Sequence, residues 1–293
     1  TEGFFAGRDR IISASLYKPA DDSLQQFFAE SPGQEADMLE ALLCELCEYQ
    51  AVISYNGDSF DLPFLKTRVS KFNIAAELPL FWSIDLYRWI KKYWPAASEM
   101  ESLSQKSMEF ALGLSDSRTD AISGRECKAL YSKWLKTGDE EAKAAILLHN
   151  EDDVRQLAAI ESSMSALPYH RIAFENGYYI DAPNASLSTG TSISTKTLKM
   201  KGISSPGRLS ADIYSGPFHF VYDGEDGRFS LDISLAEGPG VKFVDMAELP
   251  FVFGGFEELG GFHSGFLILE ENGQPRYKEI NRLCSSLIES LNT

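Results

Sequence analysis

A chain of 293 residues, 44% of them hydrophobic, is long enough for one large domain or two medium ones with a sizeable core. Its formal charge of −16 argues against a general basic surface that would bind nucleic acid through many phosphates, so any nucleic-acid contact must be local. No apolar run reaches the ~18 residues that a bilayer span requires, and we expect no association with membranes.

The predicted elements of the first 165 residues alternate between strands and helices. Two short β-rich runs, 11–17 and 24–28, are separated by turn residues and predict an antiparallel hairpin. Ser31 and Pro32 then provide a helix start. The elements that follow are a helix to about 49, a strand at 51–55, a helix at 63–72, a strand at 82–86, and helices at 87–93, 103–112, 125–136 and 140–162. This order predicts an α/β fold in which helices flank a mixed sheet.

The composition changes at about residue 178 to Ser, Thr, Gly and β-branched residues, with turn signals at 223–224, 226–227 and 272–273. We therefore expect a second, β-rich domain over 178–293, with a helix at about 278–291. A basic cluster lies near aromatic residues of this region and could stack bases of a nucleic acid, although an ordinary sheet core with a lysine edge is the favoured interpretation. The cluster consists of Lys196, Lys199, Lys201 and Arg208, and the aromatic residues are Phe218, Phe220 and Tyr222.

The four cysteines lie in segments typical of helices, without the spacing of a disulfide framework or a zinc site. This usage indicates a reducing cytoplasm. Cys44 and Cys47 form a CxxC surrounded by leucines at helical spacing. We expect both to pack in the core, and redox or metal chemistry is the alternative.

The first of two acidic motifs, 56–61, follows the predicted strand at 51–55. Asp61 precedes a helix with Pro63 near its start, so a helix N-cap explains this carboxylate without any chemistry. A carboxylate at the carboxyl end of a strand also projects into the crevice where α/β sheets bind ligands. Asn56 and Phe60 would then fix the turn and pack beneath the site.

The second acidic motif lies on the predicted helix at 140–162. His149 and Asp153 share one helix face with the apolar residues Ile146, Leu157 and Ile160. A buried carboxylate is costly unless it is paired, hydrogen-bonded or bound to a metal. His149 and Asp153 could satisfy each other as an i, i+4 pair. Taken together with Asp61, they indicate a metal-dependent site instead.

Several short motifs occur in a specific order along the first part of the chain. They begin with Asn56-x-x-x-Phe60-Asp61 and continue at 84–87, 103–113, 123–126, 137–139 and 148–154. In these motifs, residues 1 to about 165 resemble the YprB-like branch of the ribonuclease H-like DEDD exonucleases. The resemblance implies a ribonuclease H-like mixed sheet flanked by helices.

The resemblance also implies a site in which four carboxylates hold two divalent ions, Mg²⁺ or Mn²⁺. Asp61 would be the third of these carboxylates and Asp153 the fourth. The first two would belong to an Asp-x-Glu pair at the end of a strand just upstream of Thr1, because residues 1–3 match the turn that follows that pair in the family. Glu2 is a poorer alternative, since it lies too close to the next strand.

His149 lies four residues before Asp153, where one subclass of the family has Tyr and another has His one residue earlier. The resemblance makes His149 the candidate that orients or deprotonates the attacking water. An imidazole, whose ordinary pKa is about 6.5, suits a general base at neutral pH.

Other polar residues near the two motifs have simpler interpretations. We expect Asp85 to fix a strand-to-helix turn, and we expect Asp58 and Asp152 to face solvent or to support their neighbours. Lys106 is a candidate phosphate contact, although an exposed helical lysine is the simpler interpretation.

Together with these residues, the resemblance implies a metal-dependent 3′–5′ exonuclease that hydrolyses phosphodiester bonds of a single-stranded 3′ end by a two-metal mechanism. Asn56, Phe60 and Lys106 are the candidate substrate contacts. The alternatives are a catalytically inactive nucleic-acid-binding or protein-interaction module on the same fold, and a metal-dependent hydrolase with another substrate. An Asp-x-Glu pair before Thr1 would favour the nuclease.

Overall fold

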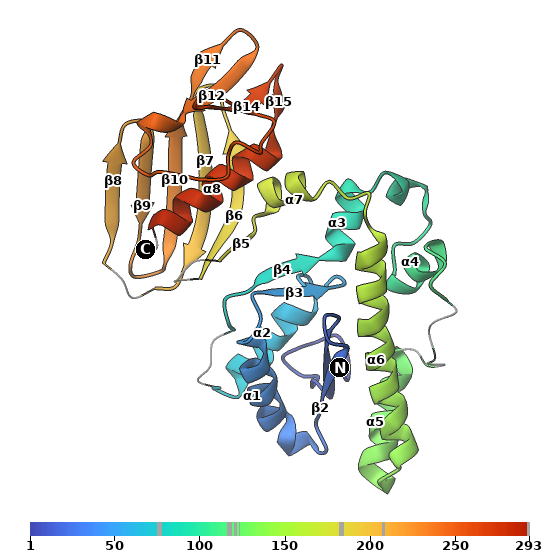
Figure 1. The fold of residues 1–293 in the computed structure, drawn as a ribbon. Helices are drawn as coiled ribbons and strands as arrows, with labels where there is room; N and C mark the ends of the chain where they lie inside the picture. Colours follow the sequence, from blue (N-terminus) through green and yellow to red (C-terminus); the bar gives the residue numbers. More distant parts are fainter. Residues whose placement is uncertain are drawn as a thin grey trace. The chain divides into compact units, whose positions relative to one another are not determined.

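The computed structural model describes residues 1–74, 78–115, 119, 122, 124–181, 185–206 and 209–291. The chain divides into two compact units, Thr1–Leu167 and Pro168–Thr293 (Figure 1). Each unit has buried hydrophobic clusters of its own. Within the described ranges, no helix is both long enough and apolar enough to cross a membrane.

The first unit alternates strands and helices in the predicted order, with shifts of a few residues at their ends. Its elements are β1 (Ser13–Lys18), β2 (Ser23–Phe28), α1 (Glu35–Leu46), β3 (Ala51–Ser54), α2 (Asp61–Lys71), β4 (Trp82–Asp85), α3 (Leu86–Tyr93), α4 (Gln105–Ala111), α5 (Gly124–Thr137) and α6 (Glu140–Ser163).

The strands of the first unit form two separate pairs. β1 and β2 are antiparallel, with Ser13 opposite Phe28, whereas β3 and β4 are parallel, with Ala51 opposite Trp82. No backbone pairing joins β1 to β3 among the described residues. The predicted mixture of parallel and antiparallel strands is therefore confirmed, but the described strands do not form one continuous sheet.

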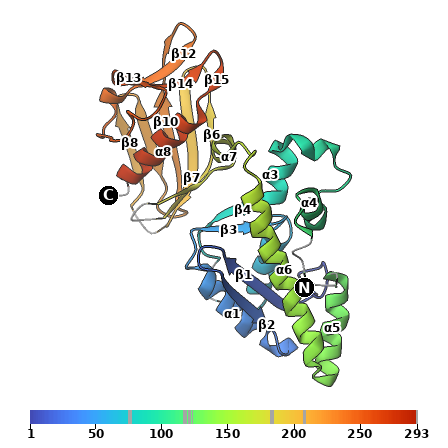
Figure 2. The same cartoon turned by 45° about the vertical axis from the view of Figure 1, so that its right-hand side comes forward.

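Helices cover both faces of the β1–β2 hairpin, which lies between α1 and α6 (Figure 2). Ile11 and Phe27 pack with leucines of α1 and apolar residues of α2. Their neighbours Ile12 and Phe28 pack instead with Tyr131 of α5 and Ile146 of α6. Successive side chains of an extended chain point to opposite faces, so this segment joins two helical layers.

A buried ion pair fixes α1 against α2. Arg68 donates two hydrogen bonds to Glu35, at 2.7 and 2.5 Å, and the two side chains are 2% and 0% exposed. The backbone N–H of Ile11 also donates to Glu35, and Arg68 donates to the carbonyl of Ala6. These bonds offset the cost of removing both charges from water and tie the segment before β1 to the helices.

The CxxC prediction is wrong on one point. Cys44 and Cys47 are both exposed. The leucine stripe around them is buried as predicted, and its members are Leu39, Leu42, Leu43 and Leu46. Cys44 lies on the opposite side of α1, and Cys47 follows the last helical residue, so the stripe is narrower than its sequence spacing indicates.

The second unit is β-rich, as predicted. A six-stranded antiparallel sheet has the order β5-β6-β7-β10-β9-β8, and a smaller sheet has the order β11-β12-β14-β13 with β15 beside β14. The elements are α7 (Tyr169–Asn176), β5 (Tyr179–Ile180), β6 (Ser186–Ile193), β7 (Thr197–Ser204), β8 (Ala211–Ser215), β9 (Phe218–Tyr222), β10 (Arg228–Ser234), β11 (Ala236–Gly238), β12 (Val241–Asp245), β13 (Phe262–His263), β14 (Phe266–Glu271), β15 (Gln274–Pro275) and α8 (Tyr277–Leu291). Apolar residues of α8 complete the core, which confirms the predicted terminal helix.

The aromatic residues near the predicted basic cluster form an ordinary sheet core. Phe218, Phe220 and Tyr222 are buried on one face of the sheet, and Lys199 and Lys201 are exposed on its opposite face. Lys199 makes an ion pair of 2.7 Å with Asp232 on the neighbouring strand. The favoured interpretation is confirmed, and base stacking on these rings is excluded by their burial. Arg208 lies outside the described residues.

Candidate functional site

The turn between β3 and α2 has a backbone that only certain residues adopt. Asn56 has a φ of 63°, in the left-handed region that Asn tolerates better than most residues. A Cβ on Gly57 would lie 2.3 Å from the Oγ of Ser54 and 2.5 Å from its Cβ, so glycine is required there. This turn directs the chain from the end of β3 into α2 at Asp61.

Asp85 organises that turn from the neighbouring strand. Its buried carboxylate accepts hydrogen bonds from the backbone N–H groups of Asn56, at 2.9 Å, and Asp58, at 3.2 Å. It also accepts one from the N–H of Arg88 as the N-cap of α3, at 3.4 Å. The predicted turn-fixing role of Asp85 is confirmed, and it extends to the turn before Asp61.

Asp61 is the first residue of α2. The helix has no side-chain cap, and its N-cap position is Phe60, so the simple N-cap interpretation of Asp61 is wrong. Desolvation by the surrounding protein raises the pKa of Asp61, and the negative charges of Asp85 and Asp153 raise it further. The carboxylate nevertheless has access to solvent. Two carboxylates that come from distant parts of the chain therefore repel each other at one place.

The middle of α6 carries the second acidic motif. The Nε2 of His149 lies 3.5 Å from the Oδ2 of Asp153, and their side chains are 9% and 39% exposed. This contact is the i, i+4 pair that the sequence allowed. Gln105 of α4 donates a hydrogen bond of 2.8 Å to the backbone carbonyl of Asp153, which fixes this part of α6.

Asp61 and Asp153 line the same cavity, which we call the carboxylate cavity. Its volume is about 430 Å³. β1 and β3 contribute opposite walls, and α6 contributes Asn150, whose amide donates to the Oγ of Ser13 at 2.5 Å. The other polar lining residues include Ser54, Ser83 and Gln105.

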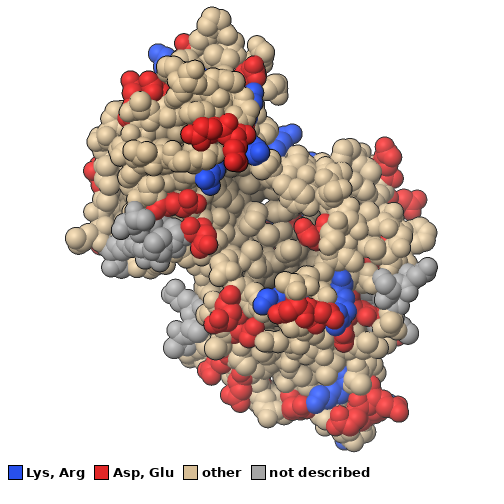
Figure 3. All heavy atoms as spheres, viewed as in Figure 1, with Lys and Arg blue, Asp and Glu red and all other residues tan. Residues whose placement is uncertain are grey.

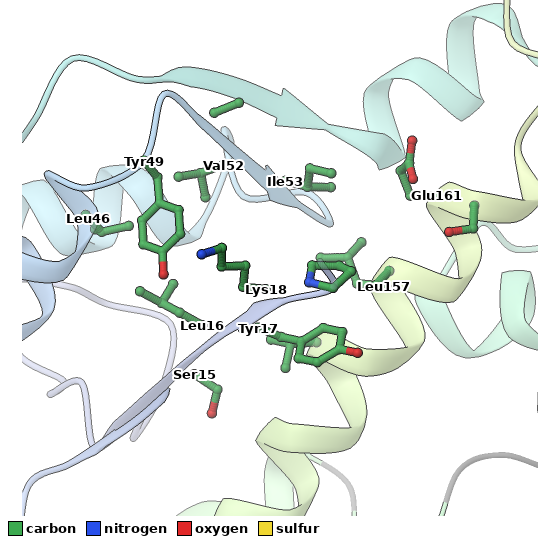
Figure 4. A pocket seen from close by; sticks show the side chains of 15 residues that line it. Ser15, Leu16, Tyr17, Lys18, Leu46, Tyr49, Val52, Ile53, Leu157 and Glu161 are labelled. Carbon is green, nitrogen blue, oxygen red and sulfur yellow. The ribbon is translucent and has the colours of Figure 1, made fainter. Parts of the chain in front are cut away.

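A second cavity of about 330 Å³ continues between the same two strands, and we call it the slot. Figure 4 shows Leu16 of β1, Val52 and Ile53 of β3, and Leu157 of α6 around this space. The sequence predicts β3 to be a buried strand, but Ile53 is 38% exposed. Among the described residues, β1 and β3 are each paired along one edge, and their apolar side chains stay partly open to the slot.

The remaining predicted residues lie around these cavities. Phe60 lines the carboxylate cavity and packs against Phe64, with ring centroids 5.5 Å apart. Lys106 is exposed on α4 and donates to the carbonyl of Ile122 at 3.3 Å. Asp58 accepts hydrogen bonds from Ser83 and Arg88 and so supports the turn.

Asp152 and Glu2 each have structural partners. Asp152 is buried and accepts from the backbone N–H and the hydroxyl of Thr119, so it supports a neighbour and does not face solvent. Glu2 forms two hydrogen bonds of 2.6 Å with Arg10, which holds the pKa of Glu2 below its usual range. This pairing disfavours Glu2 as a metal ligand.

The surface charge is consistent with the sequence. On the face in Figure 3, Lys and Arg side chains form small separate groups among more extensive acidic ones. No continuous basic surface is visible there among the described residues.

Comparison with known proteins identifies the first unit. The family model described as the ribonuclease H superfamily matches residues 1–165, more than half of the chain. The chain belongs to the ribonuclease H superfamily. It is 28% identical over 144 residues to the uncharacterized protein YprB of Bacillus subtilis (strain 168), an alignment that covers 49% of this chain and 34% of that protein. The chain thus spans about a third of the length of this curated relative. No solved structure matches.

The carboxylates of this ribonuclease H superfamily domain suit a hard divalent cation in type. Asp61 and Asp153 supply oxygen ligands, which Mg²⁺ and Mn²⁺ prefer, and a cation would relieve their repulsion. Among the described residues, however, no three His, Cys, Asp or Glu side chains are grouped so that they could hold a metal ion. A cation bound there would therefore need ligands beyond Asp61 and Asp153.

Three features of the site escape sequence reasoning. Gln105 and Asn150 line the carboxylate cavity from separate helices; both lie within the motifs at 103–113 and 148–154, but the sequence assigns them no role. The role of Asp85 in the turn before Asp61 depends on the pairing of β3 with β4. Gly57 carries the one available signal, since Asn-Gly is a turn dipeptide.

Proposed function

We propose that the first unit is a metal-dependent 3′–5′ exonuclease that hydrolyses phosphodiester bonds at a single-stranded 3′ end. The observation that carries the proposal is the meeting of Asp61 and Asp153 in one cavity. They come from elements ninety-two positions apart, yet each charge affects the other. Two neighbouring carboxylates that repel each other do not help a fold that is stabilised only by packing. A cation site requires such neighbouring carboxylates, because the bound cation offsets their repulsion. Membership of the ribonuclease H superfamily supports the nuclease class.

In this proposal, Asp61 and Asp153 hold Mg²⁺ or Mn²⁺. Two such ions, when bound, supply activation of the attacking water and stabilisation of the leaving oxygen. The protein holds Asp61 in place through the turn at Asn56 and Gly57, and it holds Asp153 through Gln105. These fixed positions lower the reorganisation required when a phosphate enters.

We propose that a segment preceding Thr1 supplies the remaining carboxylates as an Asp-x-Glu pair. Thr1 lines the carboxylate cavity, which also has lining residues from β1 and β3, and we propose that the preceding segment lies between these strands. Both strands have one unpaired edge among the described elements, and the slot between them is lined with apolar side chains. An extended segment there would gain backbone hydrogen bonds on both sides and would bury Leu16, Val52 and Ile53.

His149 is the proposed general base. Its ring contacts Asp153 through Nε2, and this contact orients the imidazole at the edge of the site. A base role predicts that His149→Gln lowers the cleavage rate about 10²- to 10⁴-fold with little change in binding. It also predicts that the fall in the parent's cleavage rate at acidic pH is absent in the variant. If His149 only pairs with Asp153, the variant should keep the same fall in rate at acidic pH.

Asn56 and Lys106 are proposed as weaker substrate contacts. Lys106 lies on the exposed side of α4, and Gln105, the residue before it, reaches Asp153. A phosphate on the strand leaving the site could replace the carbonyl of Ile122 as the partner of the Lys106 ammonium. The four free cysteines are consistent with a cytoplasmic location, which we also propose.

The deciding experiment follows the release of nucleotides from end-labelled single-stranded RNA and DNA, with Mg²⁺ or Mn²⁺ and with EDTA. The protein is prepared as residues 1–293 and with the segment that precedes Thr1 in the gene. We expect metal-dependent shortening from the 3′ end by the longer protein, and its loss in Asp61→Asn and Asp153→Asn. Asp37→Asn, an exposed aspartate on α1, is the matched control and should keep full activity.

Two results would contradict the proposal. Equal cleavage by the parent and both site variants would show that these aspartates hold no essential metal. Binding of oligonucleotides without any cleavage by the longer protein would favour the alternative of a catalytically inactive binding module.

A further inference from the structure

A third cavity, of about 1090 Å³, opens beside the carboxylate cavity, and we call it the aromatic cavity. It contains His149, and it shares four lining residues with the carboxylate cavity: Thr1, Ser13, Phe60 and Asn150. Two adjacent phenylalanines, Phe4 and Phe5, line it and are 76% and 65% exposed. Exposed aromatic rings next to a proposed catalytic site require an explanation, because burying them would stabilise the fold.

The loop that carries these rings is held in a defined conformation. Asp9 is buried, and it accepts hydrogen bonds from the backbone N–H of Phe5, at 3.1 Å, and from the side chain of Arg8. Arg8 lowers the pKa of Asp9 to about 2, so the carboxylate stays ionised in this role. A Cβ on Gly3 would lie 2.3 Å from Asp9, so glycine lets the loop close over this carboxylate.

Each of the two rings contacts another side chain of the first unit. Phe4 meets Phe60 edge to face with centroids 6.0 Å apart, and Phe60 packs on Phe64 of the core. The guanidinium of Arg8 lies over the Phe5 ring, 5.0 Å from its centroid. Phe4 and Phe5 therefore have fixed positions while much of their surface stays open to the cavity.

A lysine side chain also lines the cavity. Lys128 of α5 is exposed and lines the cavity, and its ammonium makes no hydrogen bond or ion pair with any described residue. The acidic groups nearby have cations of their own, since Glu2 pairs with Arg10 and Asp9 with Arg8. Lys128 thus leaves a local positive charge in a protein whose net charge is −16.

We infer that Phe4 and Phe5 form a stacking platform for unpaired bases next to the scissile bond, with Lys128 contacting a phosphate of the same strand. This inference rests on the proposed function and names how its substrate binds. Aromatic rings stack on any base, so the platform selects single strands without selecting sequence. A duplex cannot present its base faces, so stacking at this position requires an unpaired 3′ end.

The test measures binding, without cleavage, of a short single-stranded oligonucleotide with 2-aminopurine near its 3′ end. Ca²⁺ replaces Mg²⁺ in the assay, and the variants are Phe4→Ala, Phe5→Ala and Lys128→Gln. Each phenylalanine variant should weaken binding about tenfold and reverse the quenching that stacking produces. Lys128→Gln should weaken binding and lower the slope of log K against log salt by about 0.7.

Matched controls come from the same unit. Phe110→Ala removes a ring that is 79% exposed on α4 and lines none of the three cavities. Lys136→Gln removes an exposed lysine from the last turn of α5, the helix that carries Lys128. Both controls should bind like the parent. The midpoint of thermal unfolding should stay within a degree or two for Phe4→Ala and Phe5→Ala, because their rings are already exposed.

The outcomes separate this inference from the proposed nuclease function. If the parent binds or cleaves oligonucleotides and both phenylalanine variants do so equally well, the platform is overturned while the nuclease stands. If Phe4→Ala and Phe5→Ala unfold at much lower temperature with unchanged affinity, the rings contact protein and the platform is overturned. If the parent neither binds nor cleaves, both proposals are overturned.

Discussion

Apolar strands are buried to different extents in the two units of this chain. β10 in the second unit is paired along both edges, with β7 and β9, and Ile233 on it is completely buried. β3 in the first unit is paired along one edge, with β4, and Ile53 on it is 38% exposed. Both strands are rich in β-branched or large apolar residues, so the difference comes from their neighbours and not from their composition.

The incomplete burial in the first unit coincides with its charged groups. The carboxylate cavity and the slot share Val52 and Ile53, and the former also contains Asp61 and Asp153. Partly exposed apolar side chains and the carboxylates of Asp61 and Asp153 therefore line the same cavity. The second unit instead places its apolar side chains in one continuous core. The comparison teaches that strand pairing decides burial, and that the apolar side chains left partly open in residues 1–293 lie beside the proposed site.

The largest expected effect is the loss of the buried ion pair in the first unit. Arg68→Met leaves Glu35 ionised and buried without its partner, which should lower the free energy of unfolding by about 3–5 kcal/mol. The four tryptophans all lie in the first unit, so tryptophan fluorescence during urea denaturation measures this unit. The fluorescence midpoint should fall markedly.

An exposed ion pair of the second unit provides the control for Arg68→Met. Arg228 lies 3.4 Å from Asp226, and its side chain is 77% exposed. Arg228→Met should change the free energy of unfolding by less than about 1 kcal/mol, because water screens the pair. Equal effects of the two substitutions would contradict the argument that burial makes the Glu35–Arg68 pair important.

The second prediction compares the same substitution on the two strands. Ile233→Ala removes a fully buried side chain and should cost about 2–5 kcal/mol in the stability of the second unit. Ile53→Ala removes a partly exposed side chain and should cost well under that range, about 1 kcal/mol or less, in residues 1–293. Circular dichroism follows both units, whereas tryptophan fluorescence follows only the first.

The same pair of variants can sharpen the proposal about the slot. If the segment preceding Thr1 occupies the slot, Ile53 becomes buried in the longer protein. The cost of Ile53→Ala should then rise toward that of Ile233→Ala. An unchanged small cost in the longer protein would show that the segment does not enter between β1 and β3.

Local sequence patterns predicted the elements of the first unit but not the space between them. The hairpin at 13–28 follows from two β-rich runs and a turn, and α6 follows from its helical spacing and the Asp139 cap. These are interactions between residues close in sequence. The slot depends on which strand edges find a partner, and that is decided by contacts between distant segments.

The candidate site shows the same limit. The sequence marks Asp61 as a carboxylate that follows a strand and Asp153 as one that interrupts an apolar helix face, and the structure places both in one cavity. It does not mark Phe4 and Phe5, because two phenylalanines in a row are typical of a buried segment. Their exposure depends on the short loop closed by Asp9, a contact that a hydrophobicity pattern does not contain.

The third prediction concerns the turn before Asp61. Gly57→Ala forces a methyl group against Ser54 and should destabilise the first unit by about 1–3 kcal/mol. Ser54→Gly removes both clashing atoms, so the double variant should recover most of this loss. Gly33→Ala is the control, since its nearest contact would be 3.9 Å away. A double variant as unstable as Gly57→Ala would show that the strain comes from the backbone and not from Ser54.

The smallest expected effect has the opposite sign. The pKa of Asp61 is raised in the folded state, so folding favours its protonated form. Below the unfolded value of 3.8, both states are protonated and the ionised carboxylate costs no stability. As the pH rises through the folded pKa, the folded state must ionise a desolvated group near Asp85 and Asp153, and stability falls. In EDTA, Asp61→Asn should therefore be slightly more stable than the parent at pH 7 and equal to it at about pH 3.

Asp37→Asn provides the contrast, because Asp37 lies in the first turn of α1, where a negative charge is favourable. That variant should be less stable than the parent at pH 7, by about 0.3–1 kcal/mol. Added Mg²⁺ should stabilise the parent more than Asp61→Asn, because the variant keeps Asp153 but lacks the second carboxylate of the proposed cation site. If Asp61→Asn is destabilised at pH 7 in EDTA, Asp61 supports the fold in the way that Asp37 does. The placement of Asp61 beside Asp153 would then have no connection with metal binding.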